Sequence, residues 1–410
     1  MYKSSFLFII YISSLSFNAF GYIYNDVFLS ISYLLYFILL ISSVKYISIR
    51  NININFLILS LFIIFCFISN MYKNGLYTYL TSVLMLIFFS SHFLIGIHKR
   101  YNIDVLIISL KFSYLFLIFS VLIDFISFLI FGINPSVLSN LGLHGSSISY
   151  YGFPRLRGFQ LEPSILAYVS LFFLLMFNKI NYYKDINILY RFTPLLVIFS
   201  TMSPISIIFL FYIMISMIFT GNFLKYIKKN TFSLLTIFPL LLYLIFTNFS
   251  AQVFKVFEKL SSIVTVIETV NLNGSVGYRV FSLLEPFYFI RDSNFLYVFT
   301  GTGFSNYSEY ILKKYKYLDF SGFASGDLNS LFSAVLISTG LIGFSIFFYF
   351  IYRSCRDNNL SIFVDYNFLL IIFVLINYGN LNNPFLWIFI IFTYSLNKQV
   401  DNVSFINSNN

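Results

Sequence analysis

Charged residues are scarce in this 410-residue chain, and their scarcity decides the class of protein. Lys, Arg, Asp and Glu make up 10% of the residues, whereas a soluble domain carries about 25%. Phe alone, with 56 residues, outnumbers the 40 charged residues. Most of the chain must therefore contact hydrocarbon, which excludes a soluble globular protein.

Cysteine and alanine are scarce as well. Cys66 lies within an apolar run and Cys355 in a short polar segment, so the two Cys offer neither a disulfide framework nor a metal-ligand spacing. The chain has five Ala among many Phe, Ile, Tyr and Asn, a composition typical of AT-rich codons. We therefore draw no functional conclusion from the aromatic content, and the sequence argues against redox chemistry and structural zinc.

Apolar runs long enough to cross a bilayer make up most of the chain. A hydrocarbon core of about 30 Å needs roughly 20 apolar residues per helix. Scanning for such runs between polar breaks predicts an all-α, polytopic membrane protein with about twelve transmembrane helices. The predicted spans are residues 4–20, 27–44, 56–69, 76–97, 105–131, 164–178, 190–202, 204–220, 231–248, 330–352, 361–377 and 384–397.

Three of these spans have an alternative interpretation. Pro204 cannot donate an amide hydrogen bond, so it favours a break between two half-length helices on either side of Ser203. A re-entrant hairpin at this break is an alternative to two complete spans. The first run follows Lys3 and is expected to be retained as an anchor rather than cleaved as a signal peptide.

The distribution of Lys and Arg predicts the orientation, because short cytoplasmic loops are enriched in them. Alternating the loops places 14 cations and four acids on one side, and this difference of ten equals the whole formal net charge of +10. That side, with both termini, is predicted to be cytoplasmic. The basic balance therefore reflects membrane topology and indicates no nucleic-acid partner.

Two long loops lie on the opposite, extracytoplasmic side, where function is expected. The large loop begins with apolar residues at helical spacing from Val253 to Ile267. This pattern predicts an amphipathic helix that either lies on the outer membrane surface or packs as a lid on the bundle. The predicted segments are N-terminal transmembrane helices (1–131), a first loop (132–163), central helices (164–248), a large loop (249–329), C-terminal helices (330–397) and a cytoplasmic tail (398–410).

Polar motifs occur in a fixed order along the two loops. The first loop ends with Arg155 or Arg157, then Gly158, Glu162, Pro163 and Ala167. The second contains Gly274-Ser-Val-Gly-Tyr-Arg279, Gly301-Thr-Gly-Phe304, and Asn329 ahead of Thr339-Gly-Leu-Ile-Gly343. Over roughly residues 150 to 345, this order resembles the bacterial O-antigen polymerases and the related O-antigen ligases. The resemblance implies a bundle similar to that of the C-type glycosyltransferases.

The resemblance also implies a reaction and its partners. The protein would polymerise undecaprenyl-pyrophosphate-linked oligosaccharide repeat units into O-antigen or capsule-type polysaccharide, at the outer face of a bacterial inner membrane. Its partners would be this lipid-linked oligosaccharide, membrane lipids, and a chain-length regulator and a flippase of the same pathway. No cofactor is implied.

Arginine is the side chain best suited to such a substrate. A guanidinium is forked and always charged, so it can grip a pyrophosphate and stabilise the charge that builds on it as it departs. The chemistry requires no metal, and the outer loops contain no Asp-x-Asp pair or His cluster to hold one. Each Arg could instead be an ordinary interfacial cation. The candidates for pyrophosphate binding are Arg155, Arg157, Arg279 and Arg291.

The acidic and His candidates have alternative roles. Glu162 precedes Pro163 at a helix entrance, where it could act as general base, orient Arg157 or simply cap the helix. His144 is a second candidate base or a solvated loop residue. Asp124 lies deep in the fifth predicted span, where a carboxylate is costly, and is expected to pair with a loop Arg. The predicted catalytic set is Glu162, Arg157 and Arg279, with Asp124, His144 and Asn329 in support.

Two other functions remain as alternatives. The O-antigen ligases usually carry a His immediately before the Asn that starts the late helix, whereas this chain has Gly326-Asp-Leu-Asn329. A flippase for the same lipid-linked sugar usually has short loops and internal helical repeats, and neither is seen in this sequence.

Overall fold

The structure is a computed structural model that describes most of the predicted helical bundle. It covers residues 54–71, 103–131, 156–160, 163–181, 184–201, 203–219, 274–303, 307–314, 330–357, 360–377 and 384–408, together with four short strands and a few isolated positions before residue 91. At residues 274–280 it describes the backbone alone.

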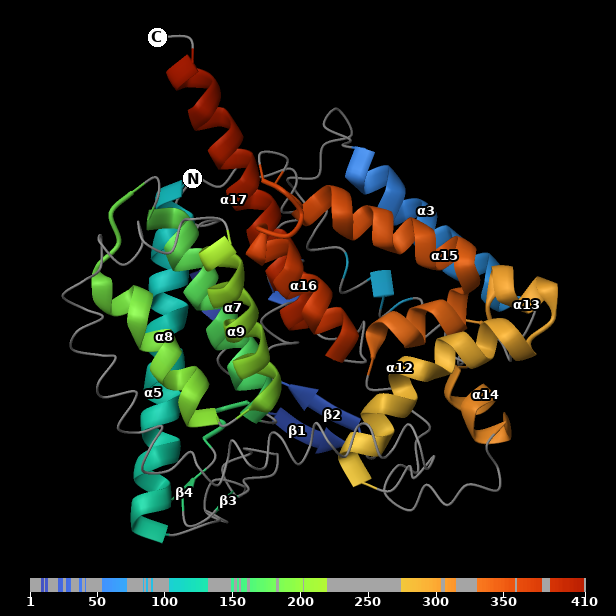
Figure 1. The fold of residues 1–410 in the computed structure, drawn as a ribbon, viewed down its shortest axis with the longest axis horizontal. Helices are drawn as coiled ribbons and strands as arrows, with labels where there is room; N and C mark the ends of the chain where they lie inside the picture. The colour runs from blue at the N-terminus through green and yellow to red at the C-terminus, as the bar shows by residue number, and fades with distance from the viewer. Residues whose placement is uncertain are drawn as a thin grey trace.

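Helices dominate the described residues (Figure 1). The helices are α3 (Ile54–Met71), α5 (Ile103–Phe131), α7 (Pro163–Asn181), α8 (Ile188–Thr201), α9 (Pro204–Phe219), α12 (Gly274–Asp292), α13 (Phe295–Thr300), α14 (Tyr307–Lys314), α15 (Leu331–Cys355), α16 (Tyr366–Asn377) and α17 (Pro384–Ser408). Two small antiparallel ribbons join β1 (Gly21–Tyr24) to β2 (Val27–Ser30) and β3 (Ser149–Tyr150) to β4 (Phe153–Pro154).

Three of the described helices are long and apolar enough to cross a membrane. They are Ile103–Ile130 in α5, Pro163–Asn181 in α7 and Leu331–Cys355 in α15. The shorter apolar helices Ile54–Ser69, Ile188–Thr201, Tyr366–Asn377 and Leu386–Lys398 also coincide with predicted spans. The chain is therefore a predominantly helical protein suited to membrane embedding, and the full set of twelve spans stays a prediction.

Three predicted boundaries differ from the structure. The predicted span 27–44 begins in β2, which pairs with β1 in an antiparallel ribbon with Tyr24 opposite Val27. The predicted span 361–377 begins as a helix only at Tyr366. The predicted tail 398–410 continues α17 to Ser408, because neither Pro nor Gly interrupts it.

Helix α7 lies at the centre of the bundle. Sixteen of its 19 residues are buried. Phe172 stacks on Phe389 of α17, with ring centroids 4.2 Å apart, and Phe173 packs against Tyr114 of α5. On a further face Tyr168 meets Phe373 of α16. The predicted first-loop motif therefore leads directly into a helix that is buried along almost its whole length.

Proline marks the predicted break between α8 and α9. Helix α8 ends at Thr201 and α9 begins with Pro204, whose missing amide hydrogen is not needed in a first turn. The two helices have 14 and 16 residues, which corresponds to about 21 and 24 Å. Both lengths fall short of the hydrocarbon core, so the re-entrant hairpin remains an alternative to two spans.

Charges predicted to share one side of the membrane do meet at one end of the bundle. Lys184, which follows α7, pairs with Asp104 at the start of α5 at 2.6 Å. Lys179, near the end of α7, pairs with Asp357 after α15 at 2.8 Å. This agrees with the predicted alternation of the loops, while the cytoplasmic orientation of that end stays a prediction.

Candidate functional site

A buried carboxylate organises the end of the first loop. Asp124 lies on α5 and is 7% exposed. Its Oδ2 accepts hydrogen bonds from the backbone amides of Arg157, at 2.8 Å, and Gly158, at 3.1 Å. Charge-assisted bonds of this kind offset the cost of burying a carboxylate. The sequence predicts that Asp124 pairs with a loop Arg; the hydrogen bonds described come from the backbone amides of Arg157 and Gly158, and an ion pair with the Arg157 side chain stays a prediction.

Glycine is required at position 158 because the loop lies directly on α5. Gly158 has φ of +56°, and a Cβ there would lie 2.6 Å from Ser120 Oγ. The amide of Gln160 donates to the carbonyl of Arg157 at 3.1 Å, and the amide of Leu156 donates to the carbonyl of Ser200 on α8 at 3.1 Å. Residues 156–160 are thus held between α5 and the end of α8. This close approach explains why a glycine directly follows Arg157.

Arg157 is enclosed by this arrangement. Its side chain is only 4% exposed. Burial lowers the pKa of the guanidinium, and the charge of Asp124 opposes that effect. A cation in a low-dielectric environment interacts more strongly with an anion than one in water does. The first-loop motif therefore presents a buried guanidinium beside a buried carboxylate at the entrance to α7.

The second-loop Gly-x-Gly motif binds a break in helix α15. Gly301 ends α13 with φ of 74°. The amide of Thr302 then donates to the carbonyl of Ile337 at 2.8 Å, and the amide of Gly303 donates to the carbonyl of Ser338 at 2.9 Å. These carbonyls lack their usual partners because the helix is interrupted at Gly340, so the loop supplies the missing donors.

The break at Gly340 is a finding that hydropathy did not predict. Gly340 has φ of 64° and ψ of −172°, which are not helical. A Cβ there would clash with the backbone of Phe299, and a Cβ on Gly301 would clash with the carbonyl of Ser338. The predicted span 330–352 coincides with α15, but the helix is broken at Gly340 and its two halves run in different directions (Figure 1).

Arg291 lies on the surface of α12 and pairs with the next residue. Its Nε donates to Asp292 Oδ1 at 2.6 Å, and its guanidinium lies over the ring of Tyr288. The hydrogen bond from Arg291 and the contact with Lys314 hold the pKa of Asp292 below its ordinary value. A role for Arg291 in pyrophosphate binding stays a prediction.

The other predicted site residues are placed only in part. Arg279 lies in the first part of α12, residues 274–280, where only the backbone is described. The convergence of the Arg157 and Arg279 guanidinium groups therefore stays a prediction. The described segments contain no group of three His, Cys, Asp or Glu that could hold a metal ion. Arg155, Glu162, His144 and Asn329 lie outside the described residues.

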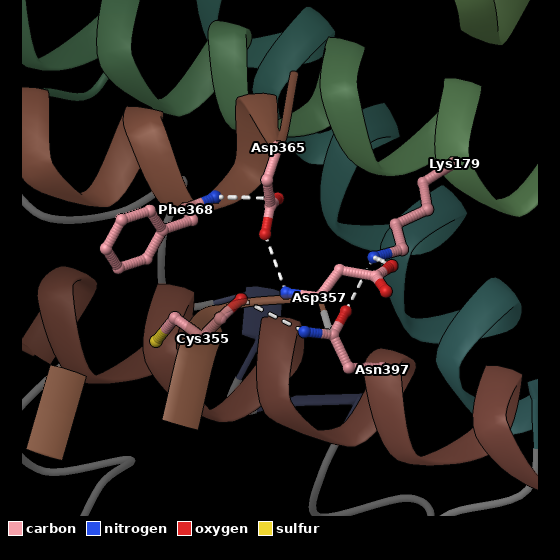
Figure 2. Close-up of polar contacts among 6 residues, drawn as sticks. All are labelled: Lys179, Cys355, Asp357, Asp365, Phe368 and Asn397. Atoms are coloured by element: carbon pink, nitrogen blue, oxygen red, sulfur yellow. Dashed lines mark hydrogen bonds and ion pairs between the residues drawn. The ribbon is translucent and has the colours of Figure 1, made fainter. Parts of the chain in front are cut away.

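A buried polar network at the other end of α7 was missed by sequence reasoning (Figure 2). Lys179 Nζ donates to Asp357 Oδ2 at 2.8 Å and to Asn397 Oδ1 at 2.6 Å. The amide of Asp357 donates to Asp365 Oδ2 at 2.6 Å, and Asn397 donates to the carbonyl of Cys355 at 3.0 Å. The network links the last turn of α7, the end of α15, the residue before α16 and the middle of α17, so it connects four helices.

Replacing Asp124 by Asn is expected to lower the free energy of unfolding by about 1 to 2 kcal/mol, because the two amide hydrogen bonds lose their charged acceptor. Trp387 is the single Trp and is fully buried, so its fluorescence in detergent micelles reports unfolding. Asp104→Asn on the same helix is the matched control, since its ion pair is exposed and should contribute less than about 1 kcal/mol. Equal losses in both variants would mean that the hydrogen bonds from residues 157 and 158 to Asp124 do not stabilise the fold.

No protein-family model, curated protein or solved structure matches this chain.

Proposed function

We propose that this protein is a membrane glycosyltransferase that extends a polysaccharide outside the cytoplasm. It transfers a growing glycan from its polyprenyl-pyrophosphate carrier to the next lipid-linked repeat unit. The single observation that carries the proposal is the pair of hydrogen bonds from the amides of Arg157 and Gly158 to Asp124. These bonds fix the backbone that bears a buried guanidinium, just before the central helix α7.

The proposed chemistry uses that guanidinium electrostatically. The acceptor hydroxyl attacks the anomeric carbon, the bond from that carbon to the pyrophosphate oxygen breaks, and the pyrophosphate leaves with the bonding electrons. Arg157 stabilises the charge that develops on the leaving group, and its fixed position avoids reorganisation during the reaction. Glu162, immediately before Pro163, is the candidate base for the acceptor proton.

The contact between the two second-loop motifs supports the same proposal. The Gly301-Thr-Gly303 turn and the Thr339-Gly340 break are separated in sequence, yet they bind each other through two backbone hydrogen bonds. These hydrogen bonds fix α13, which follows α12 in the large loop, against α15. A loop ordered in this way can present α12, which contains Arg279, to the substrate.

The proposal is tested with the full-length protein in vesicles and a synthetic lipid-linked repeat unit. Arg157→Ala should abolish the ladder of extended products, and Arg157→Lys should restore little of it, because an ammonium lacks the planar fork. Lys184→Ala is the control, since Lys184 lies at the other end of the bundle in an exposed ion pair. Long-chain product from Arg157→Ala would overturn the assignment.

A deletion strain separates this function from its alternatives. Single-repeat surface glycan indicates a missing polymerase, as proposed. Absent surface glycan with full-length lipid-linked intermediates indicates a missing ligase, and accumulation of the intermediate in the cytoplasm indicates a missing flippase. Either of the last two outcomes contradicts the proposal.

A further inference from the structure

Helices α12 and α13 form an elbow, residues 281–300, with an apolar face on each side. On the inner side Phe281 and Phe289 are buried in a small cluster with Ile337 of α15. On the outer side Phe287 is 68% exposed, with Leu283 and Ile290 beside it at helical spacing. An exposed apolar face of this kind marks contact with a membrane or another protein.

The exposed face continues through α13. None of the six residues of this helix is buried. Phe295 is 80% exposed and Leu296 is 64% exposed, so the bend between the two helices presents its largest apolar side chains outward. Tyr288 and Tyr297 are partly exposed nearby, and tyrosine is enriched where lipid meets water.

The charged residues of the elbow are paired with one another or with α14. Lys314 Nζ lies 3.0 Å from Oε1 of the fully buried Glu285 and 3.3 Å from Asp292 Oδ2. Arg291 is bound to Asp292 at 2.6 Å. Glu285, Arg291 and Asp292 are the charged residues in the sequence from 281 to 300, so each has a counter-charge. Pairing reduces the cost of bringing charges close to hydrocarbon.

The elbow is attached to apolar helices that favour lipid as its occupant. Helix α13 is fixed to α15 at the Gly301–Gly340 contact, and the two lie side by side in Figure 1. Helix α15 is apolar enough to cross a membrane. The neighbouring helix α3, which packs against α15, also exposes apolar side chains at Leu57, Leu61 and Ile64.

We propose that this elbow inserts its outer face among the acyl chains of one bilayer leaflet, the outer leaflet in the predicted orientation. Part of the segment predicted as the extracytoplasmic loop 249–329 would then be embedded in lipid. The paired charges at Arg291 and Asp292 would lie at the headgroups, and Phe287, Phe295 and Leu296 would lie below them. This inference does not depend on the enzymatic activity.

Site-directed labelling of the full-length protein tests the insertion. Cys66 and Cys355 are both fully buried, so an introduced thiol is the accessible target for a bimane label. Phe295→Cys and Phe287→Cys place the label on the elbow. Glu309→Cys on α14 is the matched control, because Glu309 belongs to the same predicted loop and is exposed and polar. Two elbow positions keep the test informative if one variant fails to fold.

The labelled proteins are placed in phosphatidylcholine vesicles with or without brominated acyl chains. Bimane at 287 and 295 should be quenched several-fold more by brominated lipid than bimane at 309, which should respond instead to aqueous iodide. Quenching of the elbow labels by iodide, with no response to brominated lipid, would overturn the proposal. Protection from both quenchers would also overturn it, because a protein surface such as a second copy would then cover the elbow.

Discussion

Replacing Gly340 by Ala should lower the free energy of unfolding by about 3 to 5 kcal/mol, the combined effect of a left-handed backbone and an overpacked contact. The backbone at this position has φ of 64°, which an L side chain rarely adopts. The added methyl group would also clash with the backbone of Phe299. Backbone cannot move aside as a flexible side chain can, so α13 must separate from α15. Detergent unfolding followed by Trp387 fluorescence measures the loss.

Ser345→Ala is the matched control for this substitution. Ser345 is exposed on the second half of α15, so exchange of its hydroxyl for hydrogen should change the free energy of unfolding by less than about 0.5 kcal/mol. If Gly340→Ala lowered the free energy of unfolding as little as this control, a regular helix through residue 340 would be as stable as the observed break.

Gly301→Ala examines the same contact from the other side. Its Cβ would clash with the carbonyl of Ser338 and the amide of Gly340. Because one separation of α13 from α15 relieves both clashes, the double variant should lose much less stability than the sum of the two single losses. Additive losses would mean that the two glycines act in independent places.

The break at Gly340 shows where sequence reasoning about a membrane helix reaches its limit. The run from Leu331 to Cys355 is predominantly apolar. Hydropathy indicates whether a segment favours lipid or water, but it does not show which backbone donors lie near it. The donors that make the break tolerable are Thr302 and Gly303, more than thirty residues earlier in the chain. A local pattern cannot report such a partner.

Asp124 could be predicted for the opposite reason. A carboxylate in an apolar run requires a compensating donor wherever it lies, so the residue alone indicated a partner. The loop nearest to the end of its helix contains Arg155 and Arg157, which limited the choice. The sequence did not show that the donors would be the amides of Arg157 and Gly158, because backbone groups carry no residue identity.

The elbow of α12 and α13 was missed because its apolar residues are too few and too interrupted for a window of transmembrane length. Arg291 and Asp292 divide them, and Pro286 lies inside α12. Only the three-dimensional contacts show that these charges are paired and that Phe287 and Phe295 point away from the bundle. The predicted loop boundaries, 249–329, therefore include a segment that is a candidate for contact with lipid.

Replacing Lys179 by Met should lower the free energy of unfolding by about 3 to 5 kcal/mol, because it leaves Asp357 as an uncompensated charge in a buried position. Asp357 is 7% exposed and has a second carboxylate, Asp365, bound to its own backbone amide. Met keeps the length of the apolar stem of Lys179, so the expected loss reflects charge rather than packing. Trp387 on α17 reports the unfolding, since Asn397 of the same helix belongs to the network.

The exposed pair at the same end of the bundle supplies the control. Lys184→Met removes an ion pair of similar length, 2.6 Å, whose side chains are more than half exposed, so its loss should stay below about 1 kcal/mol. Adding Asp357→Leu to Lys179→Met should recover most of the stability, because an apolar pair carries no unpaired charge. A Lys179→Met variant as stable as Lys184→Met would mean that the four helices are held together by apolar packing, and that the buried charges contribute little to their association.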